Sequence, residues 1–145
     1  MKILVAVDDS KFSQAAVEAV IAQIPPSNAE VRVIHVVEPI TSGPAPQMAA
    51  GYTPELAELV KEGRALVEKA AERLRGAGFK VATAVEKGDI REKIIESAAD
   101  WGATLIVLGS HGRRGVQRFL LGSVAESVAR HANCSVEIVR IAASQ

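Results

Sequence analysis

The chain has little of what several classes of protein require. One cysteine in 145 residues cannot form an internal disulfide, which favours a reducing compartment. The 17 basic residues are balanced by 17 acidic ones, which argues against a binder that relies on general attraction to nucleic acid. No apolar stretch reaches membrane-spanning length. The N-terminal apolar run is shorter than the apolar core of a signal peptide, because Asp8 and Asp9 interrupt it. We therefore expect a cytoplasmic protein with no nucleic-acid or membrane partner.

Aromatic residues are also scarce, at 3% of the chain, although 48% of its residues are hydrophobic. The core must therefore be built from valine, isoleucine, leucine and alanine. The length is that of one domain, which we place at residues 1–145.

Short apolar runs alternate with segments of helical periodicity. The runs predict five strands, at residues 2–7, 31–37, 79–85, 104–108 and 135–141. Helices are predicted to begin near residues 11, 54, 90 and 124, with Asp9 or Ser10 capping the first and Asp89 the third. This alternation predicts a doubly wound, Rossmann-like α/β fold, with a parallel sheet and helices on both faces.

The two standard phosphate-binding patterns, G-x-x-x-x-G-K-[ST] and a G-x-G-x-x-G after a strand, are absent. The chain instead has Gly109-x2-Gly112-x9-Gly122-Ser123, between an apolar run and the start of a periodic segment. Backbone N–H groups at a helix N-terminus attract anions, and glycine permits positive φ and close approach of a ligand. We interpret this loop as one that holds the phosphates of a nucleotide.

With its flanks, this spacing resembles the signature of the universal stress protein (UspA-like) family, in its ATP-binding branch. The resemblance runs from ILVAVDDS at the start, through IHVVEP, to SVEIVRI near the end. It implies the strand order 3-2-1-4-5, ATP as ligand, and a homodimer paired through the last strand, Val136 to Ile141. The family often has proline where Ser135 stands, which leaves the start of that strand open.

In such folds ligands bind at the carboxyl ends of the strands, where the strand order reverses. Asp8 and Gly109 follow the two strands that flank this point. By resemblance, Asp8 lies near the ribose and adenine, Ala6 and Val7 line the base, and the backbone of Val36 meets the edge of the adenine. The full predicted nucleotide site is Ala6, Val7, Asp8, Val36, Gly109, Gly112, Arg113, Gly122, Ser123 and Val124.

Structural explanations compete for several of these residues. Ser123 followed by Glu126 reads as a helix-capping box, which alone would explain the serine. Arg113, with Arg114 and Arg118, could belong to a solvated surface rather than contact phosphate. A Cβ at Gly122 is expected to obstruct a phosphate.

No protein metal site is predicted. His131 and Cys134 have a metal-like separation, but nothing nearby completes a zinc site, and Cys134 is expected to be a small buried residue. A magnesium ion held by the nucleotide phosphates is more plausible.

These features favour an ATP-binding regulatory module of the stress response, with at most weak ATPase activity. We expect nucleotide to order the 109–122 loop, and an unknown protein partner then to recognise the ordered surface. A slow ATPase or nucleotidyl transferase is an alternative, although the Ser-Gly-Gly type loop of related ATP pyrophosphatases is missing after the first strand. A nucleotide-free dimerisation module is another. The role of residues 40–52 is left open between a functional loop and a surface excursion.

Overall fold

Five parallel strands form the centre of the molecule, in the order β3-β2-β1-β4-β5. The structure is a computed structural model that describes residues 1–39, 54–112 and 121–141. The predicted strand order is confirmed, and each strand begins and ends within two residues of its predicted bounds. The strands are β1 (Lys2–Ala6), β2 (Glu30–Val37), β3 (Lys80–Lys87), β4 (Leu105–Gly109) and β5 (Ser135–Val139).

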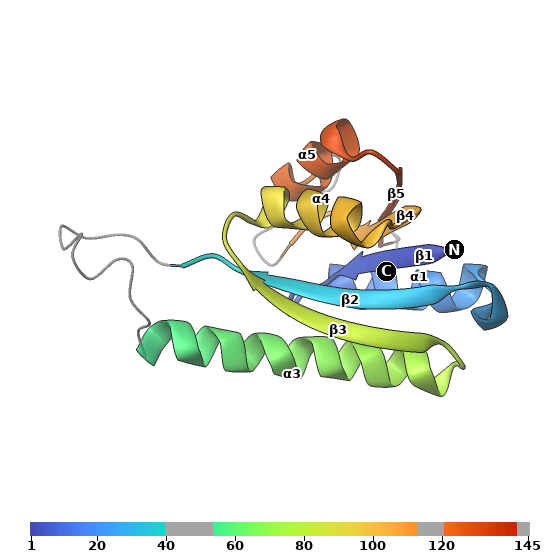
Figure 1. Cartoon of the computed structure of the whole chain (residues 1–145), viewed down its shortest axis with the longest axis horizontal. Helices are drawn as coiled ribbons and strands as arrows, with labels where there is room; N and C mark the ends of the chain where they lie inside the picture. The colour runs from blue at the N-terminus through green and yellow to red at the C-terminus, as the bar shows by residue number, and fades with distance from the viewer. Residues whose placement is uncertain (40–53, 113–120, 142–145) are drawn as a thin grey trace.

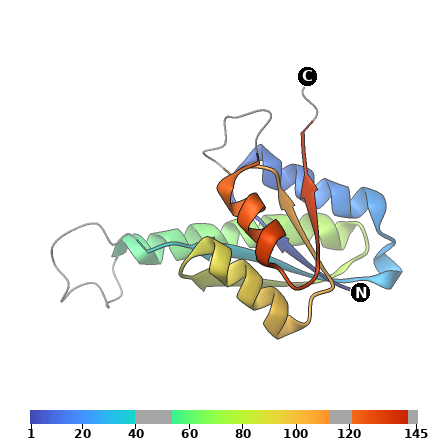
Figure 2. The same ribbon diagram turned by 90° about the horizontal axis from the view of Figure 1, so that it is seen from above.

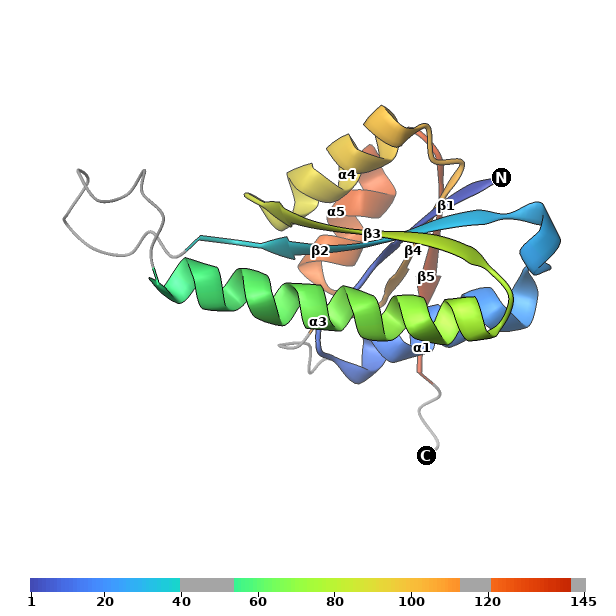
Figure 3. The ribbon, with the colours of Figure 1, turned by 60° about the horizontal axis from the view of Figure 1, so that its bottom comes forward.

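Helices cover both faces of the sheet, as the alternating pattern predicts. Helices α1 (Lys11–Gln23) and α3 (Pro54–Gly76) lie on one face. Helices α4 (Ile90–Trp101) and α5 (Ser123–His131) lie side by side on the other (Figure 1). A short 3-10 helix, η1 (Pro26–Asn28), leads from α1 into β2. Figure 3 shows α3 running along the sheet beneath β2 and β3.

The core has two layers because successive side chains of a strand point to opposite faces. In β1, Ile3 and Val5 pack toward α1 and α3, while Leu4 packs toward α4 and α5. The buried hydrophobic residues are valine, isoleucine, leucine and alanine, with Phe79 the one aromatic among those in the described ranges. The scarcity of aromatic residues thus produces an aliphatic core.

Local signals fix where two of the helices begin. Ser10 caps α1, accepting a hydrogen bond from the Ser13 backbone N–H at 3.3 Å. Asp89 caps α4, accepting one from the Glu92 backbone N–H at 3.0 Å. Both caps are confirmed. Thr53, which precedes α3, lies outside the described residues.

Gly63 lets α3 lie close to the sheet. A Cβ at this position would lie 2.7 Å from His35 Cδ2 and 3.3 Å from Val85 Cγ1. The small residue is therefore required by packing at this point of the helix–sheet contact.

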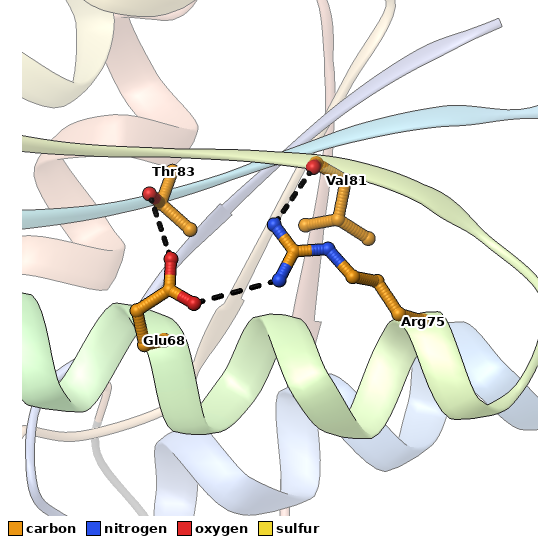
Figure 4. Close-up of polar contacts among 4 residues, drawn as sticks. All are labelled: Glu68, Arg75, Val81 and Thr83. Carbon is orange, nitrogen blue, oxygen red and sulfur yellow. Dashed lines mark hydrogen bonds and ion pairs between the residues drawn. The ribbon is translucent and has the colours of Figure 1, made fainter.

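The outer edge of β3 is tied to α3 by side chains (Figure 4). Arg75 Nη2 donates a hydrogen bond to the Val81 carbonyl at 3.1 Å. Glu68 accepts bonds from Arg75 Nη1 at 3.4 Å and from the Thr83 hydroxyl at 3.3 Å. An edge carbonyl that would otherwise be open to another strand is thereby occupied.

Candidate functional site

A cavity of about 740 Å³ opens at the carboxyl ends of β1, β2 and β4. This volume falls in the usual range for small-molecule sites. Strand order reverses here, because β1 connects through α1 to β2 on one side and lies beside β4 on the other. Figure 2 shows the starts of α4 and α5 near the ends of these strands.

Nine of the ten predicted nucleotide-site residues line this cavity. They come from four separate parts of the chain: the ends of β1, β2 and β4, and the start of α5. The tenth, Arg113, lies outside the described residues, as do Arg114 and Arg118. The nine lining residues are Ala6, Val7, Asp8, Val36, Gly109, Gly112, Gly122, Ser123 and Val124.

The Asp8 carboxylate is held by the first turn of α1. Its Oδ1 accepts hydrogen bonds from the Ser10 backbone N–H and from the Ser13 hydroxyl, both at 2.9 Å. Its Oδ2 lies toward the glycine loop, since a Cβ on Gly112 would come within 2.9 Å of it. Asp8 thus links the end of β1 to the loop that follows β4.

The predicted positive φ is not found at Gly109, Gly112 or Gly122, whereas the predicted close approach of a ligand to these glycines stays a prediction. Positive φ occurs at Gly78, Gly88 and Gly102 among the described residues, and at none of the loop glycines described. Space is what Gly109 and Gly122 need. A Cβ on Gly109 would lie 2.6 Å from Phe12 Cβ and 2.7 Å from its carbonyl oxygen.

Gly122 faces the loop after β4. A Cβ there would lie 3.0 Å from the Ser110 oxygen and 3.2 Å from His111 Cα. The Gly122 N–H donates to that same Ser110 oxygen at 2.8 Å. Gly122 therefore lets α5 begin against this loop, and the expectation that a Cβ here would obstruct a phosphate stays a prediction.

The capping-box interpretation of Ser123 is wrong. The N-cap of α5 is Gly122, no side-chain cap hydrogen bond is formed there, and Ser123 is the first helical residue. Its hydroxyl instead accepts a hydrogen bond from Arg91 Nη2 at 3.3 Å. The first N–H groups of α5 are thus left without a side-chain cap at the edge of the cavity.

Sequence reasoning missed four polar residues of the cavity wall, which are Ser13, His35, Glu38 and Arg91. Ser13, buried in α1, holds Asp8, and Glu38 accepts a bond from the Ile90 backbone N–H at 3.1 Å. Arg91 reaches the cavity from the start of α4. A signal existed for Ser13, since the first turn after β1 must lie at the point where the strand order reverses. None existed for Arg91, which depends on how α4 packs beside α5.

His111 also lines the cavity and packs its ring on Phe12, with ring centroids 5.3 Å apart. Its Nδ1 lies 3.2 Å from the Ser110 hydroxyl. Within the described ranges its Nε2 is buried without a hydrogen-bond partner. This ring contact packs His111 against the first turn of α1.

Metal-binding side chains do not gather in the described part of the chain: no group of three His, Cys, Asp or Glu could hold an ion there. Cys134 is half-buried rather than buried, because it precedes β5 at the rim of the core. This partial burial raises the pKa of its thiol. In the described ranges, no helix has both the length and the apolar character needed to cross a bilayer.

Residues 1–140 match the sequence model of the Universal stress protein family. Universal stress protein YxiE of Bacillus subtilis is 32% identical to this chain, over 96% of the chain and 98% of the relative. The solved structure of hypothetical protein MJ0577, from Methanocaldococcus jannaschii, is 29% identical with a TM-score of 0.85. That match covers 99% of this chain and 97% of the other.

Some proteins of this fold have been crystallised with adenine nucleotides. A universal stress protein in complex with cAMP has a TM-score of 0.70 at 24% identity, covering 96% of both chains. An Arabidopsis thaliana family member with AMP bound has a TM-score of 0.70 at 19% identity, covering 100% of this chain and 94% of its own. The Archaeoglobus fulgidus protein in complex with dAMP has a TM-score of 0.69 at 21% identity, covering 96% and 97%. At these identities the likeness establishes the fold.

Proposed function

Because this chain belongs to the universal stress protein family, we propose that it binds ATP in the cavity at the ends of β1, β2 and β4 and acts as a nucleotide-dependent regulatory module. One observation carries the proposal: residues predicted from four distant segments line a single cavity of nucleotide size. Adenine nucleotides bound to other proteins of the fold give the class of ligand.

The cavity wall offers both the apolar and the polar groups that an adenosine phosphate requires. Apolar side chains of Ala6, Val36 and Leu108 line the part over the strands, where a flat base can replace water. Asp8, fixed by two donors, offers an acceptor for ribose hydroxyls. We assign the base to the strands and the ribose to Asp8.

The phosphates are assigned to the start of α5. The N–H groups of Ser123 and Val124 belong to the first helical turn, which lacks a side-chain cap in the described structure. Such groups bind anions, and the helix dipole adds to the attraction. Magnesium would enter on the phosphates, as expected for an ion that commonly uses substrate oxygens. The ordering of the 109–122 loop by nucleotide stays a prediction.

Isothermal titration of the purified protein with ATP and magnesium tests the proposal. We expect saturable binding with one nucleotide per chain, and mass spectrometry of the denatured protein can detect nucleotide carried through purification. Absence of binding at millimolar ATP would refute the proposal. Turnover lost in Asp8→Ala with binding retained would favour the alternative of a slow ATPase.

We also propose that β5 pairs with its copy in a homodimer. Within the described ranges it is an edge strand that neighbours β4, whereas the β3 edge has its Val81 carbonyl occupied by Arg75. Ser110 N–H donates to the Val139 carbonyl, so backbone groups of Val139 point toward β4 and those of Val136 and Ile138 point outward.

Light scattering at micromolar concentration tests this pairing, and we expect a dimer. Val136→Pro removes an outward N–H at an edge, where proline is tolerated, and should give a folded monomer. A wild-type protein that is monomeric, or a variant that stays dimeric, would contradict pairing through β5.

A further inference from the structure

Arg91 joins the starts of two helices at the cavity. It is the second residue of α4, and its Nη2 donates to the hydroxyl of Ser123, the first residue of α5, at 3.3 Å. These residues are 32 positions apart in the chain. The guanidinium therefore lies beside the helix start to which the proposed function assigns phosphate.

The acidic groups near Arg91 are already used by the backbone. Asp89 Oδ1 accepts from the Glu92 N–H at 3.0 Å, and Glu38 Oε2 accepts from the Ile90 N–H at 3.1 Å. The approach of Arg91 Nη1 to Asp89 Oδ2 is long, at 3.8 Å, and both side chains are about two-fifths exposed, at 42% and 40%. An exposed pair at this distance holds a side chain weakly. The guanidinium of Arg91 can therefore leave Asp89 and turn toward an anion in the cavity.

Arg91 supplies positive charge to a cavity wall that otherwise carries carboxylates. Among the lining residues in the described ranges, Arg91 is the only lysine or arginine, while Asp8 and Glu38 carry carboxylates. Interaction with a fixed charge grows with the charge of the ligand. ATP carries more negative charge than AMP, and adenosine carries none.

We infer that Arg91 is a specificity-determining residue that contacts the phosphate chain and makes affinity rise with the number of phosphates. The planar guanidinium can donate two parallel hydrogen bonds to phosphate oxygens, which neither Ser123 nor a helix N–H can do. On binding, phosphate replaces the long bond to Ser123 with charge-assisted bonds. This inference rests on the proposed nucleotide site and adds to it which ligands are preferred.

The test is a titration series with adenosine, AMP and ATP on wild type, Arg91→Gln and Arg91→Lys. In Arg91→Gln we expect ATP affinity to fall roughly tenfold, the loss of a charge-assisted hydrogen bond. AMP affinity should fall by less than about threefold, and adenosine affinity should be unchanged. Arg91→Lys should recover part of the ATP affinity, since it keeps the charge but loses the fork.

Arg130→Gln is the matched control. Arg130 lies in the last turn of α5, pairs with Glu126 across one helical turn, and has a side chain 70% exposed. This variant changes net charge equally and should leave all three affinities unchanged. Thermal unfolding of each variant verifies that it is folded.

The outcomes distinguish a failure of the inference about Arg91 from a failure of the proposed nucleotide binding. Equal loss for adenosine and ATP in Arg91→Gln would overturn the inference and leave a positioning role through Ser123. Unchanged ATP affinity in that variant would overturn it as well, with nucleotide binding by the cavity intact. Failure of the wild type to bind any adenine nucleotide would overturn both the inference and the proposed function.

Discussion

The Ser13 hydroxyl holds Asp8 at two points. It accepts a hydrogen bond from the Asp8 backbone N–H at 2.8 Å and donates one to Asp8 Oδ1 at 2.9 Å. Ser13 is itself buried, with 7% of its surface exposed. The orientation of the carboxylate is therefore set by the first turn of α1 before any ligand arrives.

Replacing Ser13 should affect both stability and binding. Ser13→Ala leaves the Asp8 N–H without this acceptor, so we expect the free energy of unfolding to fall by about 1–3 kcal/mol. ATP affinity should fall as well, because the carboxylate loses a fixed orientation. Urea denaturation and titration calorimetry measure the two effects.

Ser97→Ala is the control for Ser13→Ala, since Ser97 lies in α4 and is not among the described residues that line the cavity. It should leave ATP affinity unchanged. An Asp8→Asn protein that binds ATP as tightly as wild type would show that the charge of this group is not used.

Substitutions at Ser123 and Asp89 should show that Asp89 caps its helix and Ser123 does not. Because Ser123 does not cap α5, Ser123→Ala should change the free energy of unfolding by less than about 0.5 kcal/mol. Asp89 does cap α4, and Asp89→Ala should cost about 1 kcal/mol. Urea denaturation gives both values. A cost for Ser123→Ala equal to that for Asp89→Ala would restore the capping interpretation.

Gly109 should tolerate no side chain. In Gly109→Ala the new Cβ meets Phe12 backbone atoms at 2.7 and 2.8 Å, which cannot rotate away. We expect a loss of about 2 kcal/mol or more in the free energy of unfolding.

Gly76→Ala is the matched control for Gly109→Ala. Gly76 ends α3, lacks a positive φ, and has nothing within 4 Å of an added Cβ. Its free energy of unfolding should change by less than about 0.5 kcal/mol. Equal stabilities for the two variants would contradict the close contact between α1 and the end of β4.

Cys134 should react slowly with alkylating reagents. Burial raises the pKa of its thiol, so less thiolate is present at a given pH than in the unfolded chain. The pH profile of the iodoacetamide rate should have its midpoint at higher pH in the native protein than in urea.

The raised pKa of the Cys134 thiol also makes the free energy of unfolding depend on pH. A thiol whose pKa is raised on folding binds its proton more tightly in the native state. Its stabilising contribution to the free energy of unfolding is therefore fully present below the pKa of the unfolded chain. It is lost as pH rises through the unfolded pKa toward the folded one. A native midpoint at or below the one in urea would contradict the burial of this thiol.

The elements of the fold were predictable because their signals are local. Side-chain periodicity and apolar runs gave the strands and helices, and Ser10 and Asp89 cap helices within three residues of themselves. The strand order came from the resemblance to a family, since no pattern within a strand says which neighbour it pairs with. The predicted cavity residues came together because the ends of parallel strands share one edge of the sheet.

The sequence by itself determined the alternation of strands and helices, the aliphatic composition of the core and the residues that follow β1 and β4. Tertiary structure decided that Ser123 receives Arg91 instead of capping α5, and that Gly109 is needed to admit Phe12. The physical reason is range. Propensity and capping act over a few residues, whereas the approach of α4 to α5, and of α1 to the end of β4, depends on how side chains distant in the chain fill one core.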